Sequence, residues 1–242
     1  MMTRNPFYKK IEPAGSGEAA ASYGGIAFRC IWFWLLCAAG IAAYFIVPVG
    51  AIPPAVLIGG ACVVIICPFL TYWFPATASV AGSVYSVVQG FLLALICNQY
   101  ASEYNGIIYL AVGITALVFF AALVLYRSGI VRVNSRFRGV LLTLFLTSIA
   151  GSGIVYISSF FTTVLTDFFF GNSTVAIIVS VVSLLIAAMN LVYEFDFATN
   201  LVENGICKKY EWLAAYGLFM TVILIFIRIL NLLAKFMPKR GN

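Results

Sequence analysis

The sequence contains no histidine, and only 9% of its 242 residues are charged. Without histidine, the chain lacks the commonest general base of enzymes and cannot form a zinc site of the Cys/His kind. A soluble domain carries roughly 25% charged residues, whereas 63% of this chain is hydrophobic. Too little polar surface is left to cover a water-soluble globule, so an ordinary soluble protein is excluded.

Catalytic and nucleotide-binding motifs are also missing. The sequence has no G-x-x-x-x-G-K phosphate loop, no dinucleotide fingerprint and no C-x-x-C pair among its six cysteines. Five cysteines fall inside apolar runs, where they serve as small packing residues, and Cys207 lies in a loop. We therefore expect no catalytic residue, no cofactor and no metal site.

Long apolar runs are what the sequence does contain. They are continuous rather than alternating, and a helix needs ~20 apolar residues to cross the hydrocarbon of a bilayer. The sequence predicts an all-α integral membrane protein, a bundle of seven transmembrane helices over residues 25–242 after an N-terminal tail at 1–24. The predicted spans are 26–47, 52–74, 78–99, 104–126, 139–166, 174–195 and 212–236. The sixth helix is predicted to continue past Phe195, because no proline or glycine follows until Gly205.

The basic residues predict the orientation. They gather in the N-terminal tail and in the loops after the fourth and sixth spans, at Arg4, Lys9, Lys10, Arg127, Arg132, Arg136, Arg138, Lys208 and Lys209. The positive-inside rule places these segments, and so the N-terminus, in the cytoplasm, with the C-terminus outside. Topology explains the net charge of +6, so we expect membrane lipids and no nucleic acid as partners.

Polar residues inside the last two spans form two stripes. Helical spacing places Ser183, Ala187, Asn190 and Glu194 on one face of the sixth span, and Gly217, Thr221, Arg228, Asn231 and Lys235 on one face of the seventh. Such stripes either let helices pack and hydrogen-bond or mark a functional site. We expect the stripes to meet inside the bundle, with Asn190, Glu194, Arg228 and Asn231 pointing inward.

Other polar groups in the spans have less specific explanations. Asp196 lies about 200° around the helix from Glu194, so it either faces the cytoplasmic end or is a solvated residue beside the loop. Gln89, on the same face of the third span as Ser86, either forms a hydrogen bond between helices or is a secondary polar site. Arg29 lies one turn into the first span and is expected to snorkel to the interface.

Three segments near the C-terminus resemble the Bax inhibitor-1/YccA-like membrane proteins. Ala187–Phe197 is similar to that family's A-x-N-L-V-x-D-F-D-F signature, and Tyr210–Leu218 to M-E-W-Y-A-A-F-G-L. Ile229–Lys235 is similar to the ending I-L-R-L-L-A-K. Asn5-Pro6, Tyr104–Ile107 and the basic loop at 127–138 resemble the bacterial branch. The resemblance covers essentially the whole chain.

The resemblance implies a seven-helix bundle around the last helix, in a bacterial plasma membrane. For some members it also implies a pH-sensitive calcium leak, controlled by two acidic residues that share a proton on the last two helices. Glu194 matches the first of these acids, but Arg228 stands at the position of the second. Gln89 stands where many relatives have glutamate, and 69–77 lacks the basic residues of some bacterial members.

These departures leave two functions open. A fixed cation at Arg228 repels calcium and removes proton sharing with Glu194, so a calcium or other cation leak would have an altered acidic pair. The alternative is a non-conducting protein that binds and regulates another membrane protein, such as a membrane protease. A small-molecule transporter is a third and weaker reading. A direct Glu194–Arg228 pair is also left open, with Asn190 as the other candidate partner of Arg228.

Overall fold

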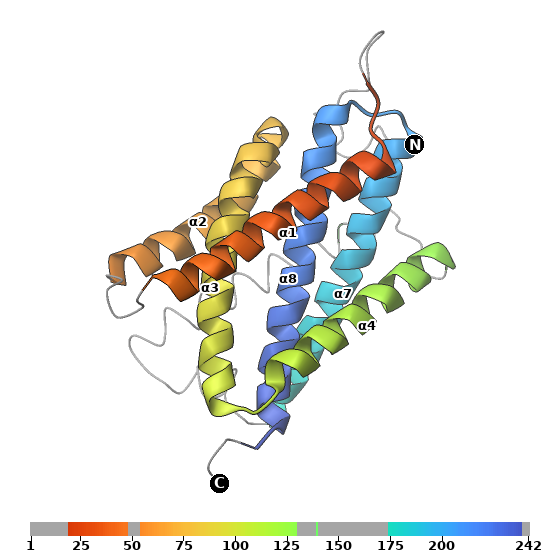
Figure 1. Cartoon of the computed structure of the whole chain (residues 1–242). Coiled ribbons are helices and arrows are strands. Elements are labelled where there is room, and N and C mark those ends of the chain that lie inside the picture. The colour runs from red at the N-terminus through yellow and green to blue at the C-terminus, as the bar shows by residue number, and fades with distance from the viewer. Residues whose placement is uncertain (1–18, 48–53, 130–138, 140–173, 239–242) are drawn as a thin grey trace. The chain divides into compact units, whose positions relative to one another are not determined.

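The computed structural model describes residues 19–47, 54–129, 139 and 174–238. Within these ranges the chain forms six α-helices and two short 3-10 helices, and the only extended pairing is an isolated bridge between Ala20 and Cys207. The helices, labelled as in Figure 1, are α1 (Tyr23–Ile46), α2 (Pro54–Trp73), α3 (Ala78–Glu103), α4 (Ile107–Arg127), α7 (Thr174–Glu203) and α8 (Glu211–Phe236). The 3-10 helices are η3 (Pro75–Thr77) and η4 (Lys208–Tyr210).

Five of the described helices are long and apolar enough to cross a membrane, namely α1, α3, α4, α7 and α8. A shorter apolar stretch, Gly59–Thr71, lies within α2. The expectation of an all-helical membrane protein with several spans is therefore confirmed. Apart from Gly139, the predicted fifth span at 139–166 lies outside the described residues, as does most of the N-terminal tail, so the number seven stays a prediction.

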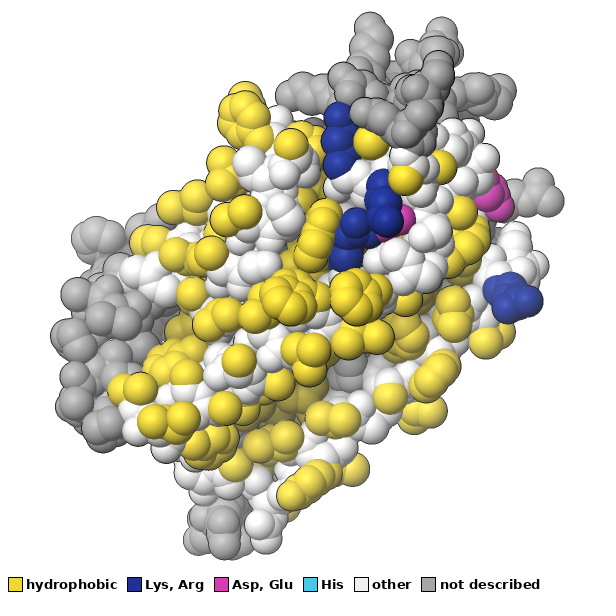
Figure 2. All heavy atoms as spheres, turned by 45° about the horizontal axis from the view of Figure 1, so that its top comes forward, with side chains coloured by type: hydrophobic (Ala, Val, Ile, Leu, Met, Phe, Trp, Pro, Cys, Tyr) yellow, Lys and Arg dark blue, Asp and Glu magenta, His cyan; other side chains and the backbone are white. Residues whose placement is uncertain are grey.

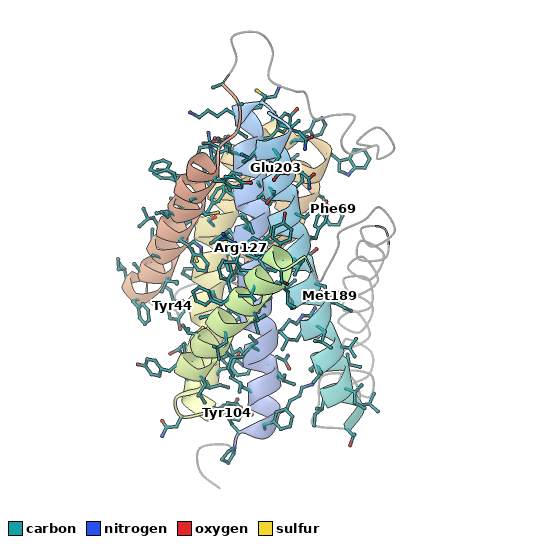
Figure 3. The ribbon with its side chains drawn as sticks, turned by 90° about the vertical axis from the view of Figure 1, so that its right-hand side faces the viewer. Tyr44, Phe69, Tyr104, Arg127, Met189 and Glu203 are labelled. Atoms are coloured by element: carbon teal, nitrogen blue, oxygen red, sulfur yellow. The ribbon has the colours of Figure 1, made fainter. Side chains whose placement is uncertain are left out.

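Helix ends follow the local sequence. The sixth predicted helix does continue to Glu203, and Gly205 follows it with φ +60°, a conformation that favours glycine and ends helices. The fourth helix begins at Ile107 instead of Tyr104 because Gly106, with φ +71°, separates it from α3. Tyr104 is buried at this turn between the two helices (Figure 3).

The contacts of the chain divide it into two compact units. The first comprises Met1–Gln99 with Asp196–Met220, and the second comprises Tyr100–Phe195 with Thr221–Asn242. In the first unit, α1 crosses α3 and the start of α8 (Figure 1). Its buried face follows helical spacing and consists of Ile26, Phe33, Cys37, Gly40 and Tyr44.

Phe33 is the centre of aromatic packing in the first unit. Its ring lies 5.7 Å from that of Trp212 and 5.8 Å from that of Phe219, both on α8. Tyr85 of α3 contacts Tyr216 of α8 at a ring separation of 5.2 Å. Aromatic side chains from three helices therefore fill the space between them, each burying a large apolar area.

The outward surface of α1 is also hydrophobic. Phe28, Leu35 and Phe45 are each more than 60% exposed. Figure 2 shows hydrophobic side chains over much of the displayed surface and few charged ones. Contiguous apolar surface of this kind is unfavourable in water and is suited to lipid.

Candidate functional site

The two polar stripes of the sequence do meet, in the second unit, between α7 and α8. The Asn190 side-chain amide donates a hydrogen bond to the Thr221 hydroxyl over 3.1 Å. Thr221 is fully buried and Asn190 is half-buried. In lipid, such a bond satisfies two polar side chains that would otherwise lack a partner in hydrocarbon. This contact confirms the predicted meeting of the two stripes at one level.

A second polar contact joins the same helices near the start of α7. The Lys235 ammonium donates to the Ala176 carbonyl oxygen over 2.8 Å and to the Ser180 hydroxyl over 2.7 Å. The sequence placed Lys235 on the stripe of the last span but missed Ser180. Ser180 lies three residues before Ser183, so it extends the stripe of α7 by about one turn. This spacing could have predicted that Ser180 belongs to the stripe. We call these two contacts, with the residues between them, the α7–α8 seam.

Glu194 and Arg228 do not form the direct pair that the sequence left open. No hydrogen bond or ion pair joins them in the described part of the chain, although Arg228 has an interaction of its own. Their levels explain this. At 1.5 Å per residue, Glu194 lies ~13 Å from the Glu203 end of α7, whereas Arg228 lies ~26 Å from the start of α8. The described partner of the Asn190 amide is the Thr221 hydroxyl.

The remaining predicted site residues are spread over both units. Asn231 is half-buried on α8 in the second unit. Asp196 belongs to the first unit, is half-buried, and accepts a bond from the Asn200 amide at its backbone oxygen over 2.6 Å. Gln89 is buried on α3, also in the first unit. Glu194, on the stripe of α7, is half-buried and has no hydrogen-bond or ion-pair partner among the described residues.

The sequence reading missed a buried ion pair in the first unit. The Arg29 guanidinium of α1 pairs with the carboxylate of Glu211, which is 0% exposed. Arg29, expected to reach the interface as a single cation, therefore has a protein partner. Its guanidinium carbon also lies 4.9 Å from the ring centre of Trp212, a cation–π contact.

The position of Glu211 explains why a carboxylate is tolerated there. Glu211 is the first residue of α8, where the helix dipole and the free backbone N–H groups favour negative charge. Its carboxylate also accepts hydrogen bonds from the backbone N–H of Ser22 over 2.7 Å and from the Ser22 hydroxyl over 3.2 Å. The sequence feature that could have predicted this pair is an acidic residue at the start of the last span together with a cation in the first span.

Loss of the Asn190–Thr221 bond is expected to destabilise the protein modestly. Thr221→Val keeps the shape but leaves the Asn190 amide without its acceptor, and hydrogen bonds between membrane helices contribute on average about 0.6 kcal/mol. At roughly 2–4 °C per kcal/mol for a chain of this size, we expect the thermal midpoint in detergent to fall by about 1–2 °C. Thr115→Val is the control, because the Thr115 hydroxyl donates only within its own helix, to the Ala111 carbonyl oxygen. Equal losses in both variants would show that the bond contributes nothing specific.

Comparison with known proteins gives a family. The family model described as Bax inhibitor 1 like matches residues 5–238. A search of the curated proteins found no match. The match includes every helix described above, the α7–α8 seam and the Arg29–Glu211 pair. With nearly its whole length matched, the chain belongs to the Bax inhibitor 1 like family.

Proposed function

We propose that this protein is a pH-modulated calcium or cation leak of the Bax inhibitor-1 type, in a bacterial plasma membrane with its N-terminus in the cytoplasm. The observation that carries the proposal is Glu194, a carboxylate within a spanning helix that no described hydrogen bond or ion pair neutralises. A charged group inside a membrane is costly, and such groups are typical of ion and proton pathways. Glu194 lies on the same stripe as Asn190, which contacts α8.

Arg228 makes this an altered leak. The family resemblance implies a second acid at this position, so that two carboxylates share a proton and respond together to pH. A guanidinium cannot share a proton with Glu194 in this way, because it keeps its positive charge across the physiological pH range. A divalent ion ~10 Å from a unit positive charge is repelled by about 3 kcal/mol at an effective dielectric constant of 20. The proposed leak is therefore weak for calcium, and Glu194 alone supplies its response to pH.

Restoring the second acid is expected to increase calcium flux. In liposomes containing the purified protein and a calcium-sensitive dye, Arg228→Asp should raise the flux about tenfold or more, since it replaces a repulsive charge by an attractive one. Glu194→Gln should give a lower flux than the unaltered protein, and this flux should depend less on pH. Glu203→Gln is the matched control, because Glu203 is an exposed acid at the end of the same helix (Figure 3).

A flux that stays at the level of empty liposomes for calcium, sodium and potassium, in the unaltered protein and in Arg228→Asp, would refute the leak. It would favour the alternative of a non-conducting protein that regulates another membrane protein. The bonds across the α7–α8 seam favour that alternative, because they hold the two helices together at two levels. Its own test is a complex of fixed stoichiometry with a membrane protease, and a change in the protease's rate when the complex forms.

The proposed orientation makes a separate prediction. Reporter domains fused at Arg132 and after Arg240 should report opposite sides of the membrane, with Arg132 in the cytoplasm. Protease accessibility in inverted and right-side-out vesicles measures both. The same side for both positions would mean an even number of spans between Arg132 and the C-terminus, hence six or eight spans in all or one re-entrant segment, and would overturn the proposed topology.

A further inference from the structure

The segment before α1 runs beside the loop before α8. The Ala21 N–H donates to the Ile206 carbonyl oxygen over 2.7 Å, and the Lys208 N–H donates to the Ala19 carbonyl oxygen over 2.9 Å. Ala20 therefore lies opposite Cys207 in an antiparallel bridge. We call residues 19–22 the strap. All of these residues belong to the first unit.

The strap is fastened at one carboxylate. The Glu211 carboxylate accepts hydrogen bonds from the backbone N–H and from the hydroxyl of Ser22. The same carboxylate pairs with Arg29, which lies further along in α1. Ser22 also caps α1, because its hydroxyl accepts the Gly25 N–H over 3.1 Å. A Cβ at position 25 would collide with the Glu211 carboxylate, so glycine at this position lets the start of α1 approach the acid.

Packing contributes little to holding the strap. Of its four residues, only Ala21 is buried, while Ala19, Ala20 and Ser22 are exposed. Hydrogen bonds to an ionised group are about twice as strong as neutral ones. The bonds to Glu211 are therefore the main attachment besides the two backbone bonds of the bridge. The charged groups nearest in the chain are Arg29, which pairs with the acid, and Lys208 and Lys209, which are exposed on η4.

We infer that the strap and Glu211 form a latch that closes over the start of α8 and shields Cys207. In the closed state Cys207 is 7% exposed. Local segments with few buried apolar contacts open more readily than the core. Opening of the strap exposes the Cys207 thiol and frees the first residue of α8 from the start of α1. The latch is independent of ion conduction, so its test does not depend on the proposed leak.

The native Cys207 thiol reports the state of the latch. A water-soluble maleimide is added to the full-length protein in detergent, and labelling at Cys207 is followed by peptide mass spectrometry. Glu211→Gln should speed this labelling about tenfold, because the charge-assisted bonds that attach Ser22 of the strap are lost. Glu203→Gln, an exposed acid close in sequence, should leave the rate unchanged. An unchanged rate in Glu211→Gln would overturn the latch.

Ala20→Cys tests the closed state directly. In an antiparallel pair bonded through its neighbours, as here, the Cα atoms lie ~4.5 Å apart, which is within the range of a disulfide. Mild oxidation should link position 20 to Cys207 and abolish maleimide labelling there. If Glu211→Gln does not fold, Ser22→Ala removes the hydroxyl that bonds to Glu211 and caps α1, and it leaves Arg29–Glu211 in place. It should speed the labelling. Failure of the disulfide to form, or a labelling rate in Ser22→Ala equal to that of the unaltered protein, would overturn the inference.

Discussion

Glu211→Gln is expected to lower the thermal midpoint of the protein in detergent by on the order of 10 °C. The substitution leaves the Arg29 guanidinium, whose side chain is 12% exposed, beside a neutral amide. Breaking a buried ion pair by removing one partner costs about 3–5 kcal/mol, because the other charge remains buried without compensation. Each kcal/mol corresponds to roughly 2–4 °C for a chain of this length.

The reciprocal variant and the double variant separate the pair from its surroundings. Arg29→Gln should destabilise to a similar degree, because Glu211 is 0% exposed and would lose its cation. The double variant Arg29→Gln with Glu211→Gln should lose much less than the two single losses added together. Strict additivity would contradict the prediction and would mean that the two side chains stabilise the protein separately. Thermal unfolding of all four proteins in one detergent is the measurement.

Gly40→Ala and Gly90→Ala are each expected to destabilise the protein by about 1–3 kcal/mol or more. A Cβ on Gly40 of α1 would collide with the Val87 carbonyl oxygen of α3, and a Cβ on Gly90 of α3 would collide with the Cys37 carbonyl oxygen of α1. Both collisions are with backbone atoms, which cannot rotate away as the end of a side chain does. The two helices therefore approach closely at two reciprocal glycines, as small residues allow in membranes.

Gly113→Ala is the control for these two variants. Gly113 lies within α4, and a Cβ there would meet no atom within 4 Å. Alanine is a better helix former than glycine by about 1 kcal/mol in water, so this change should be neutral or slightly stabilising. Thermal midpoints in detergent should fall for Gly40→Ala and Gly90→Ala and stay level or rise for Gly113→Ala. A drop of equal size in all three would refute the close contact of α1 with α3.

The sequence predicted the helices of the described chain closely, because each depends on a local property. Long apolar runs define spans, and Gly205, named in advance as the stop of the sixth helix, does follow its end. The turn at Gly106 was missed, so the fourth span was predicted to begin three residues too early. Periodicity also placed Asn190 on one face of α7 and Thr221 on one face of α8, and these two residues are in contact. The face on which a residue lies depends only on its spacing along its own helix. Polar faces on two consecutive spans are unfavourable against lipid, so they tend to contact each other.

The partners across helices were harder to predict. Spacing gave the faces of Glu194 and Arg228 but not their levels, and the direct pair between them is not formed in the described chain. Arg29 was assigned to the interface because a lone cation near a helix end normally snorkels. Its acid, Glu211, is far away in sequence, and no periodic pattern links one span to another at that distance.

Composition and hydropathy by themselves therefore determined that this is an all-helical membrane protein, and motifs near the C-terminus indicated the Bax inhibitor 1 like family that the family match then showed. Both depend on properties of contiguous residues. Only the tertiary structure decided which polar groups meet: Asn190 with Thr221, Lys235 with Ser180, and Arg29 with Glu211. The reason is physical, because these contacts depend on the depth, tilt and closeness of helices. The side chains of several helices set those quantities together, including the reciprocal glycines that bring α1 against α3.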